Sequence, residues 1–102
     1  MKGDCDLMSE KKVIAFYLEG CPYCRQAREA VKEIISENPE KYSSVKIEWV
    51  EENQHPEISS QYDYYRVPTF FVDGVKVSEA RPGEKYEECK ENVKRVFEEA
   101  LS

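Results

Sequence analysis

Residues 13–24 read VIAFYLEGCPYC, an apolar run followed by two cysteines with two residues between them. The continuous apolar run at 13–18 predicts a buried central strand, because an edge strand would alternate apolar and polar residues. After the cysteines, apolar residues recur at three- and four-residue spacing, which predicts a helix at 22–37. A strand therefore delivers Cys21 and Cys24 to the first turn of a helix, where unpaired N–H groups and the helix dipole favour a thiolate.

The spacing of these cysteines predicts a redox reaction. Two intervening residues allow both sulfurs to join in one small ring, as in a dithiol that cycles between open and closed forms. Cys21 is the more N-terminal of the pair, and we expect its thiolate to attack a substrate disulfide. Cys24 lies one turn inside the helix, and we expect it to resolve the mixed disulfide.

The rest of the chain predicts a single α/β domain. Asp73-Gly74 is a two-residue hairpin signal, and Pro82-Gly83 interrupts the chain before a last amphipathic helix. Strands are expected at 13–18, 45–51, 67–72 and 75–78, and helices at 22–37, 56–62 and 84–101. The order β-α-β-α-β-β-α predicts a mixed four-stranded sheet flanked by three helices. The first strand–helix–strand unit is expected to be parallel and right-handed, and the hairpin antiparallel.

Composition limits the kind of partner. The chain has 102 residues and a formal net charge of −6, which disfavours nucleic acid and anionic membrane surfaces as partners. No apolar run approaches the roughly 20 residues of a membrane span. Residues 1–11 read as a polar lead-in without the apolar core of a signal peptide, and 12–102 as the domain. We therefore expect a cytoplasmic monomer.

The remaining cysteines and the single histidine predict no metal site. The four cysteines lack the two close pairs of a four-cysteine zinc site. Cys89 lies on the apolar stripe of the last helix, which predicts a buried structural residue. Cys5 is expected to be a surface thiol in the lead-in, and His55 a surface residue.

Two motifs give the chain a family resemblance. Cys21-Pro22-Tyr23-Cys24 stands in a strand-to-helix turn, and Val67-Pro68-Thr69 precedes a strand and a glycine-containing hairpin. Over residues 12–101 this pattern resembles the thioredoxin/glutaredoxin superfamily. The resemblance implies a thioredoxin fold and a cis peptide bond before Pro68. It also implies that the backbone of Val67 and the ring of Pro68 receive an extended substrate.

The resemblance further implies the substrates and the electron donor. Cys-Pro-Tyr-Cys is similar to the dithiol motif of glutaredoxins, so protein disulfides or glutathione mixed disulfides are the expected substrates. Glutathione is the implied reducing co-substrate, with no bound cofactor. Tyr23 and Arg66 are candidate substrate-binding residues, because one lies between the cysteines and the other precedes Val67.

Other interpretations stay open at this point. Glutaredoxins usually carry a lysine where Leu18 stands, and paired glycines before the last helix where residues 78–84 read SEARPGE. A thioredoxin-like donor fed by a thioredoxin reductase is therefore an alternative. Two non-enzymatic alternatives are a carrier of an iron–sulfur cluster and a thioredoxin-fold binding module.

Overall fold

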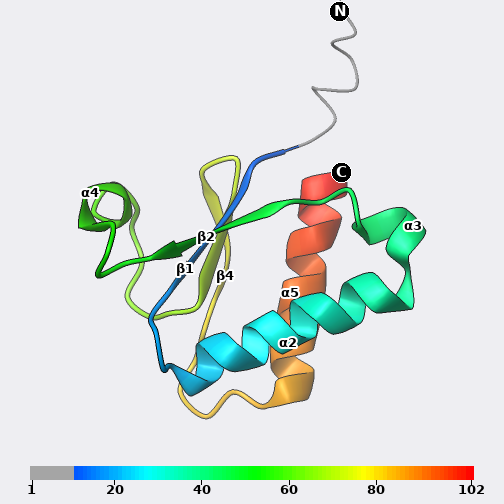
Figure 1. Cartoon of the computed structure of the whole chain (residues 1–102), viewed down its shortest axis with the longest axis horizontal. Helices are drawn as coiled ribbons and strands as arrows, with labels where there is room; N and C mark the ends of the chain where they lie inside the picture. Colours follow the sequence, from blue (N-terminus) through cyan, green and yellow to red (C-terminus); the bar gives the residue numbers. More distant parts are fainter. Residues whose placement is uncertain (1–10) are drawn as a thin grey trace, which may run out of the picture.

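The computed structural model describes residues 11–102, so Cys5 and nearly all of the expected lead-in lie outside the described part. The elements in chain order are β1 (Val13–Tyr17), α2 (Pro22–Glu37), α3 (Pro39–Tyr42), β2 (Ile47–Glu51), α4 (Pro56–Ser59), β3 (Thr69–Val72), β4 (Val75–Glu79) and α5 (Tyr86–Leu101). The strands form one sheet in the order β2-β1-β3-β4 (Figure 1).

The pairing of the strands confirms the expected mixed sheet. β1 is parallel to β2 and antiparallel to β3, and β3 pairs with β4 in an antiparallel hairpin. At the hairpin, Asp73 and Gly74 have φ values of 50° and 84°, a left-handed turn that glycine adopts at no steric cost. β3 begins at Thr69 rather than at 67, because Pro68 has no N–H to give to the sheet.

One helix was not expected from the sequence. We predicted three helices, and residues 11–102 contain four, because Asn38-Pro39 ends α2 and also begins α3. The Asn38 side chain accepts a hydrogen bond from the N–H of Lys41 at 3.4 Å, and Pro39 occupies the first helical position. A proline that closes one helix can thus open the next.

The two faces of the sheet are covered unequally. α2 and α5 cross over one face (Figure 1), and their apolar residues form the larger core with the inward side chains of β1 and β3. Cys89 belongs to this core with 3% of its surface exposed, which confirms the structural role expected for it. The other face has a smaller core, in which Phe16 and Phe71 pack against Tyr62 and Tyr64.

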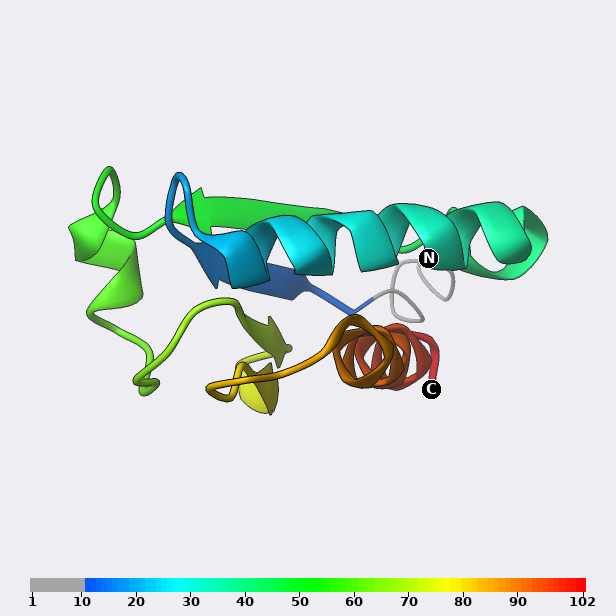
Figure 2. The ribbon, with the colours of Figure 1, turned by 90° about the horizontal axis from the view of Figure 1, so that it is seen from below.

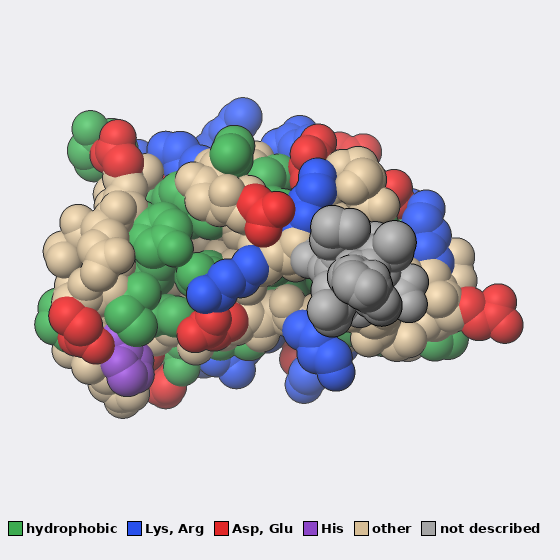
Figure 3. All heavy atoms as spheres, turned by 90° about the horizontal axis from the view of Figure 1, so that it is seen from above, with side chains coloured by type: hydrophobic (Ala, Val, Ile, Leu, Met, Phe, Trp, Pro, Cys, Tyr) green, Lys and Arg blue, Asp and Glu red, His purple; other side chains and the backbone are tan. Residues whose placement is uncertain are grey.

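Hydrophobic side chains remain visible on the less covered side. In Figure 3 they lie beside His55, near the one-turn helix α4. His55 is exposed, as expected. Within residues 11–102, no helix combines the length and the apolar character needed to cross a membrane.

The register brings three chain segments to one end of the sheet. Phe16, near the end of β1, pairs with Thr69 at the start of β3, and Thr69 pairs with Glu79 at the end of β4. The start of α2, the loop before β3 and the β4–α5 connection therefore lie at the same end. Figure 2 shows the molecule from this side.

Candidate active site

Cys21 occupies the capping position of α2. Its backbone is extended, with φ −79° and ψ 121°, and its Sγ accepts a hydrogen bond from the N–H of Cys24 at 3.3 Å. The preceding turn is closed by the N–H of Cys21, which donates to the carbonyl of Leu18 at 3.3 Å, and Gly20 within it has φ 78°. The sulfur thus lies where the helix presents unpaired N–H groups.

The two cysteines differ in their access to solvent. Cys21 is partly exposed, whereas Cys24 has only 3% of its surface exposed. Burial, and next the hydrogen bond with the Cys21 side chain, raise the pKa of the Cys24 thiol to about 12. At neutral pH Cys24 is therefore a buried thiol, and Cys21 is the sulfur that an incoming disulfide can reach.

Both cysteines line a cavity of about 270 Å³, which we call the cysteine cavity. It is lined by residues 17–20, both cysteines, Arg25 and Arg28. Two cationic side chains thus lie beside the reactive pair.

Arg28 is the better fixed of these two arginines. It follows Cys24 by four residues, and so lies on the same face of α2. Its guanidinium carbon lies 4.5 Å from the ring centre of Tyr17 and 4.8 Å from that of Trp49. Two cation–π contacts hold the charge beside the cavity.

The loop before β3 has the conformation that the resemblance implied. The Val67–Pro68 peptide bond is cis, Pro68 is buried, and Val67 packs against the smaller core. The hydroxyl of Thr69 donates to the carbonyl of Arg66 within the same loop. This loop lies at the end of the sheet where β1 leads to Cys21, because Thr69 pairs with Phe16.

Tyr23 and Arg66 lie outside the cysteine cavity. The hydroxyl of Tyr23 accepts a hydrogen bond from the N–H of Gly83 at 2.8 Å, which ties α2 to the β4–α5 connection. The side chain of Arg66 is exposed and lines a neighbouring cavity of about 350 Å³. Substrate binding by these two residues, and by Val67 and Pro68, stays a prediction.

The loop that carries Cys21 is anchored by Glu51, at the end of β2. Glu51 has 6% of its surface exposed. Its carboxylate accepts hydrogen bonds from the N–H groups of Glu19 at 3.1 Å, Asn53 at 2.7 Å and Gln54 at 3.0 Å. The N–H of Glu19, ahead of the other two, lowers the pKa of Glu51 and outweighs the opposing effect of burial. The loop two residues before Cys21 is thereby joined to the neighbouring strand.

The loop before Pro68 is anchored in the same way by Glu79, at the end of β4. One carboxylate oxygen accepts N–H groups from Tyr65 at 2.5 Å and Arg66 at 2.7 Å, and the other accepts from Lys76 at 2.8 Å. Burial opposes ionisation, but Lys76 and these two N–H groups outweigh it and lower the pKa of Glu79. Glu51 and Glu79 are below called the loop-anchoring carboxylates.

Sequence reasoning missed three of these residues. Glu51 accepts a hydrogen bond from a backbone N–H group 32 residues away, and Glu79 accepts two from N–H groups 13 and 14 residues away. No local sequence pattern reveals contacts of this kind. For Arg28 a signal existed, because its four-residue spacing from Cys24 places both on one helix face.

Stability is expected to fall as the pH drops below about 4.5, the ordinary pKa of both loop-anchoring carboxylates. Their folded-state pKa values are lowered, so their contribution is present above the unfolded value and is lost as the pH falls through the folded one. Urea unfolding from pH 7 to pH 3 measures this. The double variant Glu51→Gln, Glu79→Gln should be less stable at pH 7 and lose less on acidification. Glu48→Gln, an exposed control, should behave as the parent; equal acid sensitivity in the double variant would contradict the prediction.

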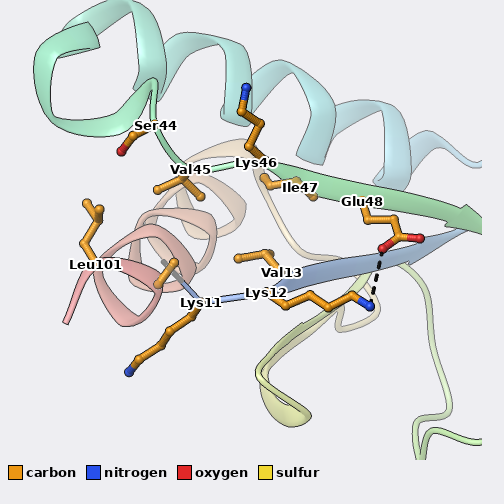
Figure 4. A pocket seen from close by; sticks show the side chains of 10 residues that line it. Lys11, Lys12, Val13, Ser44, Val45, Lys46, Ile47, Glu48 and Leu101 are labelled. Carbon is orange, nitrogen blue, oxygen red and sulfur yellow. Dashed lines mark ion pairs between the residues drawn. The ribbon is translucent and has the colours of Figure 1, made fainter. Parts of the chain in front are cut away.

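A further cavity lies at the opposite end of β1 from the cysteines. It measures about 360 Å³ and includes Val13, Val45 and Ile47, with Leu101 at its edge. Figure 4 shows the side chains of Lys11 and Lys46 extending away from it. No cysteine lines it.

Within residues 11–102, the other groups with metal-binding or thiol chemistry form no second site. Within the part of the chain that the structure describes, no three His, Cys, Asp or Glu side chains are grouped to hold a metal ion. Burial, and then the charge of Glu84, raise the pKa of the Cys89 thiol to about 11. Cys89 is therefore a neutral core residue at physiological pH.

A partly exposed cysteine at a helix start, a buried cysteine three residues on and a cis-proline loop at the same sheet end define a dithiol redox site. The comparisons with known proteins agree with that class. The thioredoxin-domain family matches residues 10–88. A thioredoxin of Methanocaldococcus jannaschii is 30% identical over 67 residues, which cover 66% of this chain and 75% of that protein. The chain belongs to the thioredoxin family.

Solved structures show the same fold. The oxidised thioredoxin from Plasmodium falciparum aligns with a TM-score of 0.62 at 16% identity, covering 100% of this chain and 94% of that one. The thioredoxin of Malassezia sympodialis aligns with a TM-score of 0.63 at 18% identity, covering 92% and 77%. The expected thioredoxin fold is confirmed, and the protein is a thioredoxin-like redox protein with a close Cys21–Cys24 pair.

Proposed function

We propose that this protein is a thiol–disulfide oxidoreductase that reduces protein disulfides through Cys21 and Cys24. The observation that carries the proposal is the unequal burial of the two thiols at the start of α2. Solvent and substrate reach Cys21, and the Cys24 thiol is withheld by burial until a mixed disulfide brings a sulfur to it.

The reaction then takes two exchange steps. The Cys21 thiolate attacks one substrate sulfur, forms the Cys21–substrate disulfide and releases the other substrate sulfur as a thiolate, which takes up a proton. Cys24 loses its proton to solvent, attacks Cys21 and displaces the second substrate sulfur. The substrate gains two electrons and two protons, and the protein is left with a Cys21–Cys24 disulfide.

The oxidised pair needs a two-electron donor. We propose a thioredoxin reductase drawing on NADPH, supported by the similarity to thioredoxins and by the absence of paired glycines at 78–84. Glutathione is the alternative co-substrate, which the Cys-Pro-Tyr-Cys motif supports. A reducing, cytoplasmic setting fits both donors.

The experiment is reduction of the oxidised protein in two arms. One arm supplies glutathione with glutathione reductase, and the other supplies a thioredoxin reductase with NADPH. Reduction in the second arm alone supports the thioredoxin-type donor, and fast reduction by glutathione replaces it with the glutaredoxin-type assignment. Failure to reduce any protein disulfide, even with dithiothreitol as electron source, would overturn the proposed function.

Replacing Cys24 with Ser is expected to trap the reaction halfway. Cys21 can still attack, but nothing resolves the mixed disulfide within the protein. A substrate carrying a disulfide should therefore remain covalently attached, as a band on a non-reducing gel that dithiothreitol removes. Reduction of protein disulfides should fall by about 100-fold or more, since the resolving thiol is lost. Release of reduced substrate at the parental rate would contradict the role of Cys24.

A further inference from the structure

The arginines of this chain line two cavities, one beside the cysteine pair and one beside the loop that leads to Pro68. All five line one of two cavities: Arg25 and Arg28 the cysteine cavity, and Arg66, Arg81 and Arg95 the neighbouring one. We call the second the loop cavity, because it is bordered by the loop that leads to Pro68. No lysine of residues 11–102 lines either cavity.

Both cavities carry an excess of positive charge. In the cysteine cavity two arginines face one carboxylate, that of Glu19. In the loop cavity three arginines face Glu79, whose oxygens are already engaged by two backbone N–H groups and Lys76. The chain as a whole has a formal net charge of −6, so these cavities oppose its general charge.

No guanidinium group forms an ion pair within residues 11–102. Among residues 11–102, the ion pairs with carboxylates are made by lysines and by His55, and by no arginine. Arg28 is oriented by the rings of Tyr17 and Trp49 rather than by a carboxylate. The side chain of Arg95 donates a hydrogen bond to the amide oxygen of Asn92, at 3.1 Å.

Arginine recognises anions of carboxylate or phosphate geometry, and in a protein substrate the side chains of Asp and Glu supply the carboxylates. The planar guanidinium presents paired N–H donors that match a carboxylate, which explains why arginine predominates where carboxylates are recognised. The cysteine cavity borders the loop that carries Cys21, and the loop cavity borders the loop that leads to the cis-proline Pro68. We propose that this protein selects disulfide substrates that carry Asp or Glu residues next to the reacting cysteines. The proposal rests on the proposed function and names the substrate class of that site.

The test uses three peptide disulfides of equal length that differ only beside the cysteines. One carries Asp and Glu there, one Asn and Gln, and one Lys. The kcat/KM of each is measured with the parent protein and dithiothreitol as electron source. The acidic peptide is expected to react about fivefold faster than the amide peptide, the Lys peptide slowest, and the differences should shrink at high salt.

Variants show whether the arginines cause the preference. In Arg28→Gln with Arg66→Gln, one residue from each cavity, the ratio of the acidic to the amide kcat/KM should fall toward one. Lys94→Gln removes the same charge from α5 outside both cavities and should keep the parental ratio.

The outcomes separate this inference from the proposed function. Equal rates for all three peptides with the parent protein would overturn the inference and leave the oxidoreductase in place. An acidic preference of unchanged size in the double arginine variant would also overturn it. If the parent reduces none of the peptides and no protein disulfide, the proposed function itself fails.

Discussion

Replacing Cys21 with Ser is expected to lower kcat/KM for disulfide reduction by about 1,000-fold or more, because a serine hydroxyl stays protonated and does not attack sulfur. Residues 11–102 offer no substitute for it. Cys24 is 3% exposed, and burial raises the pKa of its thiol to about 12, so at neutral pH it is neither reachable nor ionised. The measurement is steady-state reduction of a protein disulfide at pH 7 with dithiothreitol as electron source.

The matched control for this variant is Cys89→Ala. Cys89 is as buried as Cys24 but lies on the core-facing side of α5, so its removal should leave the kcat/KM near the parental value. Substantial turnover by Cys21→Ser would mean that Cys24 is the attacking thiol. The assignment of the two roles would then have to be reversed.

Replacing Phe16 with Ala is expected to destabilise the protein by about 3–5 kcal/mol, as for a large aromatic residue deleted from a core. Phe16 is fully buried, with ring centres 5.0 Å from Tyr62, 5.0 Å from Tyr64 and 5.9 Å from Phe71. It fills the smaller core, which α4 and the following loop cover alone. Urea unfolding measures the loss, and hydrogen exchange locates it.

Exchange should accelerate most in residues 58–67, because their tyrosines lose the ring against which they pack. Val75→Ala is the control: this side chain is 65% exposed on β4, and its truncation should change stability by less than about 0.5 kcal/mol. If Phe16→Ala lowers the free energy of unfolding by less than about 1 kcal/mol, the prediction is wrong and the side chains of the smaller core have repacked to fill the cavity.

The regular elements could be predicted from the sequence because their causes are local. The apolar run of β1, the periodicity of α2 and the Asp73-Gly74 turn each depend on neighbouring residues. Cys89 was placed in the core by its position on a helical stripe. Element ends were less well predicted: β2 begins at Ile47 rather than at 45, since Val45 is still tied to the turn after α3 through the carbonyl of Tyr42.

The site was only partly predictable. The cysteine pair and the proline loop follow from motifs, but the contacts that fix their positions span the sheet. Glu51 ends a strand with three other glutamates nearby, at positions 48, 52 and 57, and nothing in the sequence distinguishes it. Its role arises only when β2 and β1 lie side by side. The gathering of the arginines around two cavities is likewise a property of the folded chain.

The anchoring of both loops through main-chain N–H groups has a consequence for how this protein can change over evolution. Glu51 and Glu79 bind the backbone at positions 19, 65 and 66, and every amino acid except proline supplies that N–H. The side chains at positions 19, 65 and 66 are therefore not needed for these hydrogen bonds. Substitutions at these positions can therefore change the surface that contacts a partner, while the main-chain hydrogen bonds that hold the Cys21 loop and the proline loop are kept.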